Sequence, residues 1–236
     1  MPAEDSRAAP GPSAIEQVVE RMEAIARGLP AQDGVACFND LYLAVTRAVA
    51  VEAGADGFED VAFLAALDVV FADIYFDAVD ADERMERVAH AWKPLFQARA
   101  RPKVAAIQFA LAGLNAHINH DLSLALVETF LQRGLRPDRD SPQHRDYLRV
   151  NALLERVQEQ VKARFAVGLV GVADAALGRL DDLVAAWSVA HARDAAWTNA
   201  EALWALRPLP ELARDYREKL GRLVELAGWG LLTPTL

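Results

Sequence analysis

One apolar segment, from Pro102 to Arg133, constrains the fold of this chain more than any other stretch. Its run from Val104 to His120 contains no Asp, Glu, Lys or Arg, and apolar side chains cover nearly the whole circumference of the helix that it predicts. Such a helix would be a rod of about 45 Å. Because a helix that is apolar on every side has to be buried, we expect the other helices to pack around it.

The rest of the chain predicts further helices and no strands. Ser13 and Glu16 form a capping box that starts the first helix, and a second such pattern at Asp80 and Glu83 is expected to open a fourth. Residues 1–12 are rich in Pro, Ala and Gly and are expected to be a disordered tail. Residues 13–236 therefore predict an all-α single-domain bundle of about eight or nine helices around the long buried central helix. Besides the central segment, the expected helices cover residues 13–28, 35–53, 60–79, from 80 across an interruption at 93–94, 142–165, 167–177, 180–206 and 211–227.

Composition and charge exclude several classes of protein. The net charge of −9 argues against a nucleic-acid-binding surface, which needs clustered basic residues. Cys37 is the only cysteine, so an intrachain disulfide and a cysteine-based zinc site are both excluded. The central segment is too polar and slightly too short to span a membrane, and the acidic start of the chain does not predict a secretory signal. We therefore expect a cytoplasmic protein without a membrane span.

The central helix carries a cluster of polar side chains in otherwise apolar surroundings. His117, His120 and Asp121 share one face of roughly 100°, whereas Asn115 and Asn119 point to the opposite side. Two neutral imidazoles and a carboxylate can bind a divalent metal such as Fe, Mn or Zn, or exchange protons with a substrate. They can equally form a buried network that crosslinks helices. His117, His120 and Asp121 are therefore candidate catalytic residues and metal ligands. The two asparagines are expected to have a structural role.

A second set of candidates lies on the helix expected at 180–206. Arg193 flanks one face of this helix. That face combines tryptophans with carboxylates: Trp187, Asp194, Trp197, Glu201 and Trp204. A tryptophan stripe at helical spacing is typical of a core, but carboxylates are rarely buried unpaired. The carboxylates either form ion pairs with Arg193 or another helix, or complete a site with the histidines. Together with Tyr75, from the apolar face of the helix at 60–79, this set is the predicted ligand-binding group.

The tract Asn115-Ala-His-Ile-Asn-His-Asp-Leu122 resembles a family of bacterial, largely actinobacterial, proteins of unknown function. The resemblance implies an all-helical domain and supports the choice of site, but it implies no activity. It extends to looser matches over most of the chain, at residues 69–75, Trp92, Phe96, residues 146–151, Arg193, Trp197 and Trp204.

Two hypotheses of function follow from these candidates. In the first, the protein is an enzyme that acts on a small hydrophobic molecule, such as a lipid, terpenoid or polyketide, at the buried His/Asp site, with or without a divalent metal. In the second, the protein binds a ligand or another protein without catalysis, and the His/Asn/Asp tract is a structural network. The sequence leaves the reaction, the substrate and the oligomeric state open.

Overall fold

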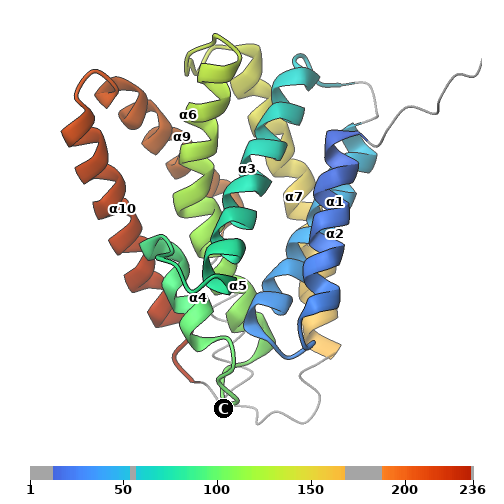
Figure 1. The fold of residues 1–236 in the computed structure, drawn as a ribbon. Helices are drawn as coiled ribbons and strands as arrows, with labels where there is room; N and C mark the ends of the chain where they lie inside the picture. The colour runs from blue at the N-terminus through green and yellow to red at the C-terminus, as the bar shows by residue number, and fades with distance from the viewer. Residues whose placement is uncertain (1–12, 54–56, 168–187, 235–236) are drawn as a thin grey trace, which may run out of the picture.

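A computed structural model describes residues 13–53, 57–167 and 188–234, and every element within them is helical (Figure 1). The predicted all-α single domain is confirmed. The expected tail, residues 1–12, and nearly all of the helix expected at 167–177 lie outside the described residues. Within the described ranges, no helix combines the length and the apolar character that crossing a membrane requires.

Three helices form one side of the bundle: α1 (Ala14–Gly28), α2 (Gly34–Ala53) and α3 (Val61–Glu83). The predicted capping box is present at the start of α1, where Ser13 accepts the backbone N–H of Glu16 and the Glu16 carboxylate accepts the N–H of Ser13. α1 packs against both α2 and α3, and Figure 1 shows α1 and α2 side by side. The local capping signal therefore determines where α1 begins.

The helix that was expected to open at Asp80 does not form there, because α3 continues through this residue to Glu83. Asp80 forms an ion pair with Arg21 of α1, and Asp82 pairs with Arg99 at 2.8 Å. The prediction of a helix start is wrong because these carboxylates bind arginines of neighbouring segments instead of capping a new helix.

The predicted central helix is present as three consecutive segments: α5 (Ala106–Ala116), the π-helix η2 (His117–Asp121) and α6 (Leu122–Gln132). A 3-10 turn, η1 (His90–Trp92), and the short α4 (Lys93–Ala98) precede it. α5 packs against α2 and α10, and α6 packs against α3 and α9. The central helix is therefore covered by neighbours along its length, as its apolar circumference predicts.

The bundle is completed by α7 (Pro142–Val167), α9 (Val189–Leu206) and α10 (Pro210–Leu231). α9 begins later than the Leu180 that the sequence suggested, because the hydroxyl of Ser188 accepts the N–H of His191 and caps the helix there. Residues 180–187 themselves lie outside the described part of the chain.

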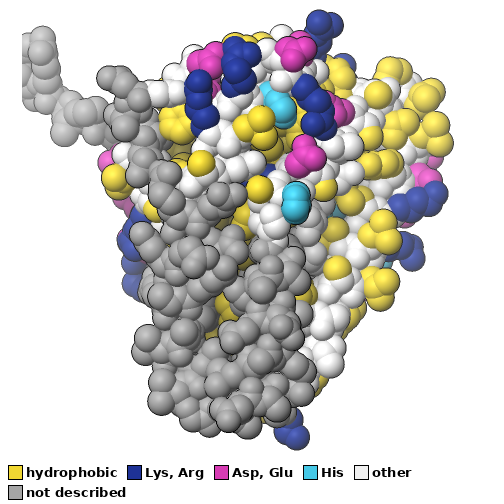
Figure 2. All heavy atoms as spheres, turned by 180° about the vertical axis from the view of Figure 1, so that it is seen from behind, with side chains coloured by type: hydrophobic (Ala, Val, Ile, Leu, Met, Phe, Trp, Pro, Cys, Tyr) yellow, Lys and Arg dark blue, Asp and Glu magenta, His cyan; other side chains and the backbone are white. Residues whose placement is uncertain are grey.

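Two clusters of buried side chains form the core. One, around Phe38 and Trp92, joins α1, α2 and α3 to α5, and the other, around Phe130 and Trp197, joins α3 and α6 to α7 and α9. Burying each large side chain of this kind contributes roughly 1.5–3 kcal/mol. On the face seen from behind, Lys and Arg side chains lie beside Asp and Glu side chains, with hydrophobic side chains between them (Figure 2).

Candidate functional site

The polar cluster of the central helix coincides with a π-turn. The backbone N–H of Leu122 donates to the carbonyl of His117, five residues earlier, so the turn from His117 to Asp121 is wider than an α-helical turn. Single π-turns inside α-helices occur frequently at functional sites. Here the wider turn brings two histidines and one aspartate of the same helix into direct contact.

Asp121 is the centre of this contact, and its side chain is completely buried. Its two oxygens accept hydrogen bonds from three donors: Nε1 of Trp92 at 2.9 Å, Nδ1 of His120 at 2.7 Å and Nδ1 of His117 at 3.4 Å. Burial alone raises the pKa of Asp121, but the hydrogen bonds from the two histidines outweigh it, so this pKa lies below its ordinary value. Asp121 is therefore a buried carboxylate that orients both imidazoles.

His117 is held as a neutral imidazole between aromatic rings. Its ring stacks on Phe71 with centroids 3.5 Å apart, and Tyr42 contacts it edge-on at 4.4 Å. Burial lowers the pKa of His117 despite the opposing effect of Asp121. Because Asp121 accepts the proton of Nδ1, Nε2 carries the lone pair, and this buried atom has no hydrogen-bond partner among the described residues.

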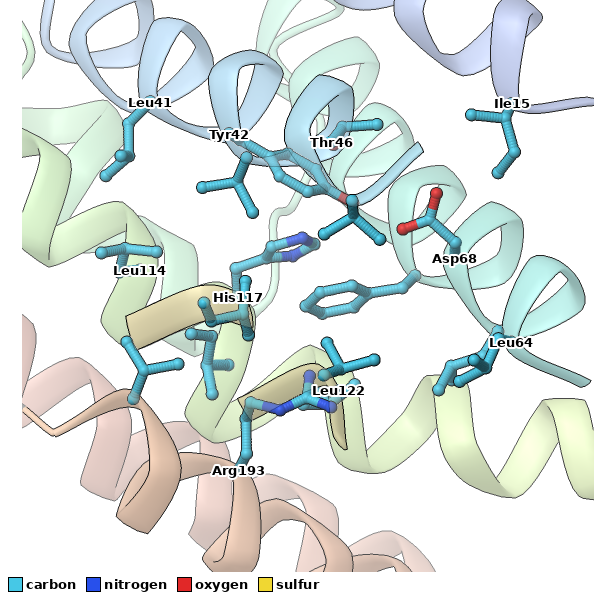
Figure 3. A pocket seen from close by; sticks show the side chains of 18 of the residues that line it. Ile15, Leu41, Tyr42, Thr46, Leu64, Asp68, Leu114, His117, Leu122 and Arg193 are labelled. Carbon is cyan, nitrogen blue, oxygen red and sulfur yellow. The ribbon is translucent and has the colours of Figure 1, made fainter. Parts of the chain in front are cut away.

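His117 lies on the wall of an almost entirely apolar cavity of about 210 Å³. Residues of α2, α3, α5 and α9 line it, among them Leu41, Leu64 and Leu111. Figure 3 shows His117 pointing from η2 toward Tyr42 of α2, with Arg193 of α9 on the opposite side. An apolar cavity of about 150 Å³ is large enough for benzene, so this one can hold a slightly larger organic molecule.

One end of the cavity carries polar groups from outside the predicted ligand-binding set. The hydroxyls of Tyr42 and Thr46 are buried without a hydrogen-bond partner in the described part of the chain. Figure 3 shows the Asp68 carboxylate and the Tyr42 hydroxyl directed toward the same space. Burial raises the pKa of Asp68 to about 6. Tyr42 and Thr46 lie one helical turn apart in the largely apolar α2. Two polar residues at this spacing are common on helix surfaces, so the pattern did not indicate a binding site.

His120 has different surroundings from His117 and does not line the cavity. Its Nε2 lies beside Gly221 of α10, 3.5 Å from where a Cβ of that residue would be. The three predicted catalytic residues therefore meet one another at Asp121, but only His117 borders the cavity.

The residues of this cluster do not fit a metal site in the observed arrangement. Among the described residues, no three His, Cys, Asp or Glu side chains are grouped so that they could hold a metal ion. Both Nδ1 atoms already face Asp121, and the Nε2 atoms of His117 and His120 face the cavity wall and Gly221, respectively. A metal bound by all three residues would have to replace the hydrogen bonds of Asp121.

The two asparagines of the tract make contacts that hold helices together. Nδ2 of Asn115 donates to the carbonyl of Val224 in α10 at 2.8 Å, and Nδ2 of Asn119 donates to Oδ1 of Asn115 at 3.1 Å. The Asn115 bond ties the central helix to α10, and Asn119 binds the Asn115 side chain within the central helix; the sequence suggested a structural role for both.

Most of the predicted ligand-binding set lies away from the cavity. Asp194 and Glu201 both bind Arg139 on the surface, and Nε1 of the buried Trp197 donates to Glu201. Trp204 packs on Phe130 outside the cavity. These carboxylates thus form ion pairs with another segment of the chain, one of the two alternatives that the sequence left open.

The three remaining members of the predicted ligand-binding set are Tyr75, Trp187 and Arg193. Tyr75 is buried behind His117, and its hydroxyl donates to Oδ1 of Asn39 at 3.2 Å. Trp187 lies outside the described residues. Of the described members of the set, only Arg193 lines the cavity, as His117 does.

Comparison with known proteins gives a family and no activity. The family of unknown function DUF5995 matches residues 15–234, which is nearly the whole chain. No curated protein and no solved structure matches it. Any function therefore has to be argued from the site itself.

Proposed function

Since the chain belongs to the DUF5995 family, whose function is unknown, we propose from the site geometry that it is an enzyme that binds a hydrophobic small molecule in the cavity and uses His117 for acid–base chemistry. The observation that carries this proposal is Nε2 of His117, a buried lone pair without a partner on the wall of an apolar cavity. Leaving such an acceptor unpaired is unfavourable by about 1–3 kcal/mol, so a ligand that donates to it is favoured.

The pairing of His117 with Asp121 supports a general-base role. A carboxylate that accepts the Nδ1 proton fixes the tautomer in which Nε2 is the base, and it stabilises the imidazolium formed after proton transfer. The lowered pKa of His117 keeps the base unprotonated near neutral pH. The apolar surroundings suit a lipid, terpenoid or polyketide substrate.

A second candidate function is ligand binding without catalysis. It is favoured by the stacking of Phe71 on His117, because this ring covers the imidazole and leaves Nε2 with almost no accessible surface. A substrate reaches Nε2 only if the side chains packed around His117 move, whereas a bound ligand can fill the cavity with them in place.

We infer that His117, His120 and Asp121 do not bind one metal ion together, because Asp121 accepts hydrogen bonds from Trp92 and from Nδ1 of both histidines, while the two Nε2 atoms face different surroundings. The net charge of −9 and the mixed charges in Figure 2 support a small-molecule partner rather than nucleic acid. The cytoplasmic location and the bacterial, largely actinobacterial, origin belong to this proposal and rest on the sequence resemblance and composition.

Binding is tested with a small neutral hydrophobic fluorophore, naphthalene, whose two fused rings suit a cavity somewhat larger than one that holds benzene. We expect saturable binding by the wild type and its loss in Leu111→Trp, because the indole fills the cavity that Leu111 lines. Leu131→Trp is the control, since Leu131 is exposed on α6 and does not line the cavity. Equal binding by both variants would contradict the cavity as the site.

Catalysis is tested by comparing the wild type with His117→Asn in a mixture of hydrophobic metabolites analysed by mass spectrometry. The asparagine keeps a donor toward Asp121 and removes Nε2. We expect a compound that the wild type and the Glu201→Gln control consume and that His117→Asn binds without converting it. Conversion by His117→Asn at the wild-type rate, or by none of the three proteins, would favour the binding-only function.

A further inference from the structure

Arg193 is a buried cation without an acidic partner among the described residues. Only 7% of its surface is exposed. Its Nε donates to Oδ1 of Asn151 at 2.6 Å, one terminal nitrogen donates to the carbonyl of Tyr147 at 3.0 Å, and the guanidinium lies 4.0 Å from the centroid of the Tyr147 ring. All of these partners are neutral. Buried arginines are almost always paired with a negative charge, so this arrangement is unusual.

The acids that could pair with Arg193 are engaged elsewhere or face another part of the cavity. Its neighbour in sequence, Asp194, points outward and binds Arg139 at 3.2 Å. Asp68, the acid that lines the cavity, projects from α3, while Arg193 enters from α9 (Figure 3). No ion pair joins Arg193 to an acid within the described ranges. A negatively charged ligand would therefore give Arg193 the ionic partner that it lacks among the described residues.

The free donors of Arg193 suit a carboxylate. A guanidinium has five N–H groups, and two of them bind Asn151 and Tyr147. The remaining donors are on the two terminal nitrogens, which form the edge that binds a carboxylate with two parallel hydrogen bonds. The same residue lines the apolar cavity whose walls include Leu111 and Ile118. One cation beside an apolar volume matches a molecule with one anionic end and a hydrocarbon body.

We propose that the ligand of this cavity is an amphipathic monocarboxylate, a medium-chain or aromatic organic acid, whose carboxylate binds Arg193 and whose apolar body fills the cavity. This inference rests on the proposed function, because it identifies the class of the hydrophobic molecule bound there. A phosphate ester fits less well, since its further oxygens would face apolar walls with no second cation among the described lining residues.

The inference is tested by calorimetric titration of the whole protein with decanoate and with decanol at pH 8, where the acid is fully charged. The two probes share their chain length and differ in the head group. A hydrogen-bonded charge pair of this kind corresponds to a factor of about 10–100 in affinity. We therefore expect the wild type to bind decanoate at least about tenfold more tightly than decanol.

Arg193→Met removes the cation and keeps an apolar side chain of similar length. We expect it to lose about 10–100-fold in affinity for decanoate and to bind decanol within about twofold of the wild type. Arg139→Met, which removes an exposed arginine outside the cavity, is the matched control and is expected to bind both probes like the wild type. If Arg193→Met does not fold, the comparison of the two probes on the wild type still decides.

The outcomes separate the two proposals. If the wild type binds decanol as tightly as decanoate, or if Arg193→Met weakens both probes equally, the carboxylate inference is overturned while the hydrophobic cavity stands. If neither probe nor the neutral fluorophore binds, the proposed function fails, and the inference fails with it.

Discussion

The imidazole of His117 lies face to face with the ring of Phe71, with centroids 3.5 Å apart and planes inclined by 5°. Tyr42 contacts the same imidazole edge-on, with centroids 4.4 Å apart. The orientation of His117 is therefore fixed by two aromatic neighbours as well as by its long hydrogen bond to Asp121. This packing explains how a polar ring stays in an apolar wall, and it makes the protonation state of His117 measurable.

His117 is expected to remain neutral, with its proton on Nδ1, at pH values where a free imidazole is charged. Its folded-state pKa lies below the ordinary 6.5, so the unfolded chain binds a proton that the folded chain does not. The stability contributed by the neutral form is therefore present above pH 6.5 and is lost as the pH falls below it. The wild type should lose up to about 1.4 kcal/mol relative to His117→Asn between pH 7.5 and 5.5.

Nitrogen-15 NMR of histidine-labelled protein checks the tautomer directly, and urea unfolding at the two pH values checks the linkage. A protonated Nε2 at pH 7, or parallel stabilities of the two proteins across this range, would contradict the assignment.

Asp121→Asn is expected to destabilise the fold by about 2–4 kcal/mol. The variant removes a buried negative charge that accepts from Trp92, His117 and His120, and its amide N–H group faces at least one of these donors. Asp215→Asn is the matched control, because Asp215 forms an exposed ion pair with Lys219 that contributes at most about 1 kcal/mol. Urea unfolding of both variants measures the difference, and equal stabilities would show that Asp121 does not organise the cluster.

Gly113→Ala is expected to destabilise the fold by about 1–3 kcal/mol through overpacking. A Cβ at this position of α5 would lie 2.3 Å from the ring of Phe38, which is itself completely buried beside His117. Gly28→Ala, where a Cβ would meet nothing within 4 Å, is the control and is expected to be neutral or slightly stabilising. Thermal unfolding followed by circular dichroism compares the two, and an unchanged Gly113→Ala protein would show that α2 and α5 separate easily.

Local signals made most of the fold predictable from the sequence. The capping box at Ser13 acts within one turn, and the apolar circumference of the central segment reports its burial directly. The wrongly predicted helix start at Asp80 shows the limit of this reasoning. The residue that was expected to cap a helix forms an ion pair with Arg21, which is far away in sequence. A capping motif cannot show by itself whether tertiary contacts use its carboxylate.

The candidate site was predictable only in part, because its geometry depends on residues far apart in sequence. The spacing of His117 and Asp121 indicated that they share a helix face. That inference assumes a regular α-helix, so it could not predict the π-turn or the third donor to Asp121, Trp92. Glu201 was expected near the histidines or in an ion pair, and its partner Arg139 is 62 residues away in sequence. Such long-range pairs leave no local pattern.

Asp68→Asn is expected to stabilise the protein above pH 6 and to have no effect below about pH 4. Burial raises the folded-state pKa of Asp68 from 3.8 to about 6, so the folded chain holds a proton that the unfolded chain has released. Stability due to this residue is therefore greatest at low pH and falls as the pH rises toward 6. Asparagine resembles the neutral acid at every pH, so the gain above pH 6 is at most about 3 kcal/mol.

Urea unfolding at pH 4 and pH 8 measures this difference. Asp77→Asn, on the exposed face of the same helix, is the control and is expected to change stability by less than about 0.5 kcal/mol at either pH. A gain of the same size at both pH values would show that the asparagine acts through packing and not through the charge of Asp68. A loss of stability at pH 8 would show instead that the Asp68 carboxylate has a stabilising partner. This result would contradict the raised pKa of Asp68.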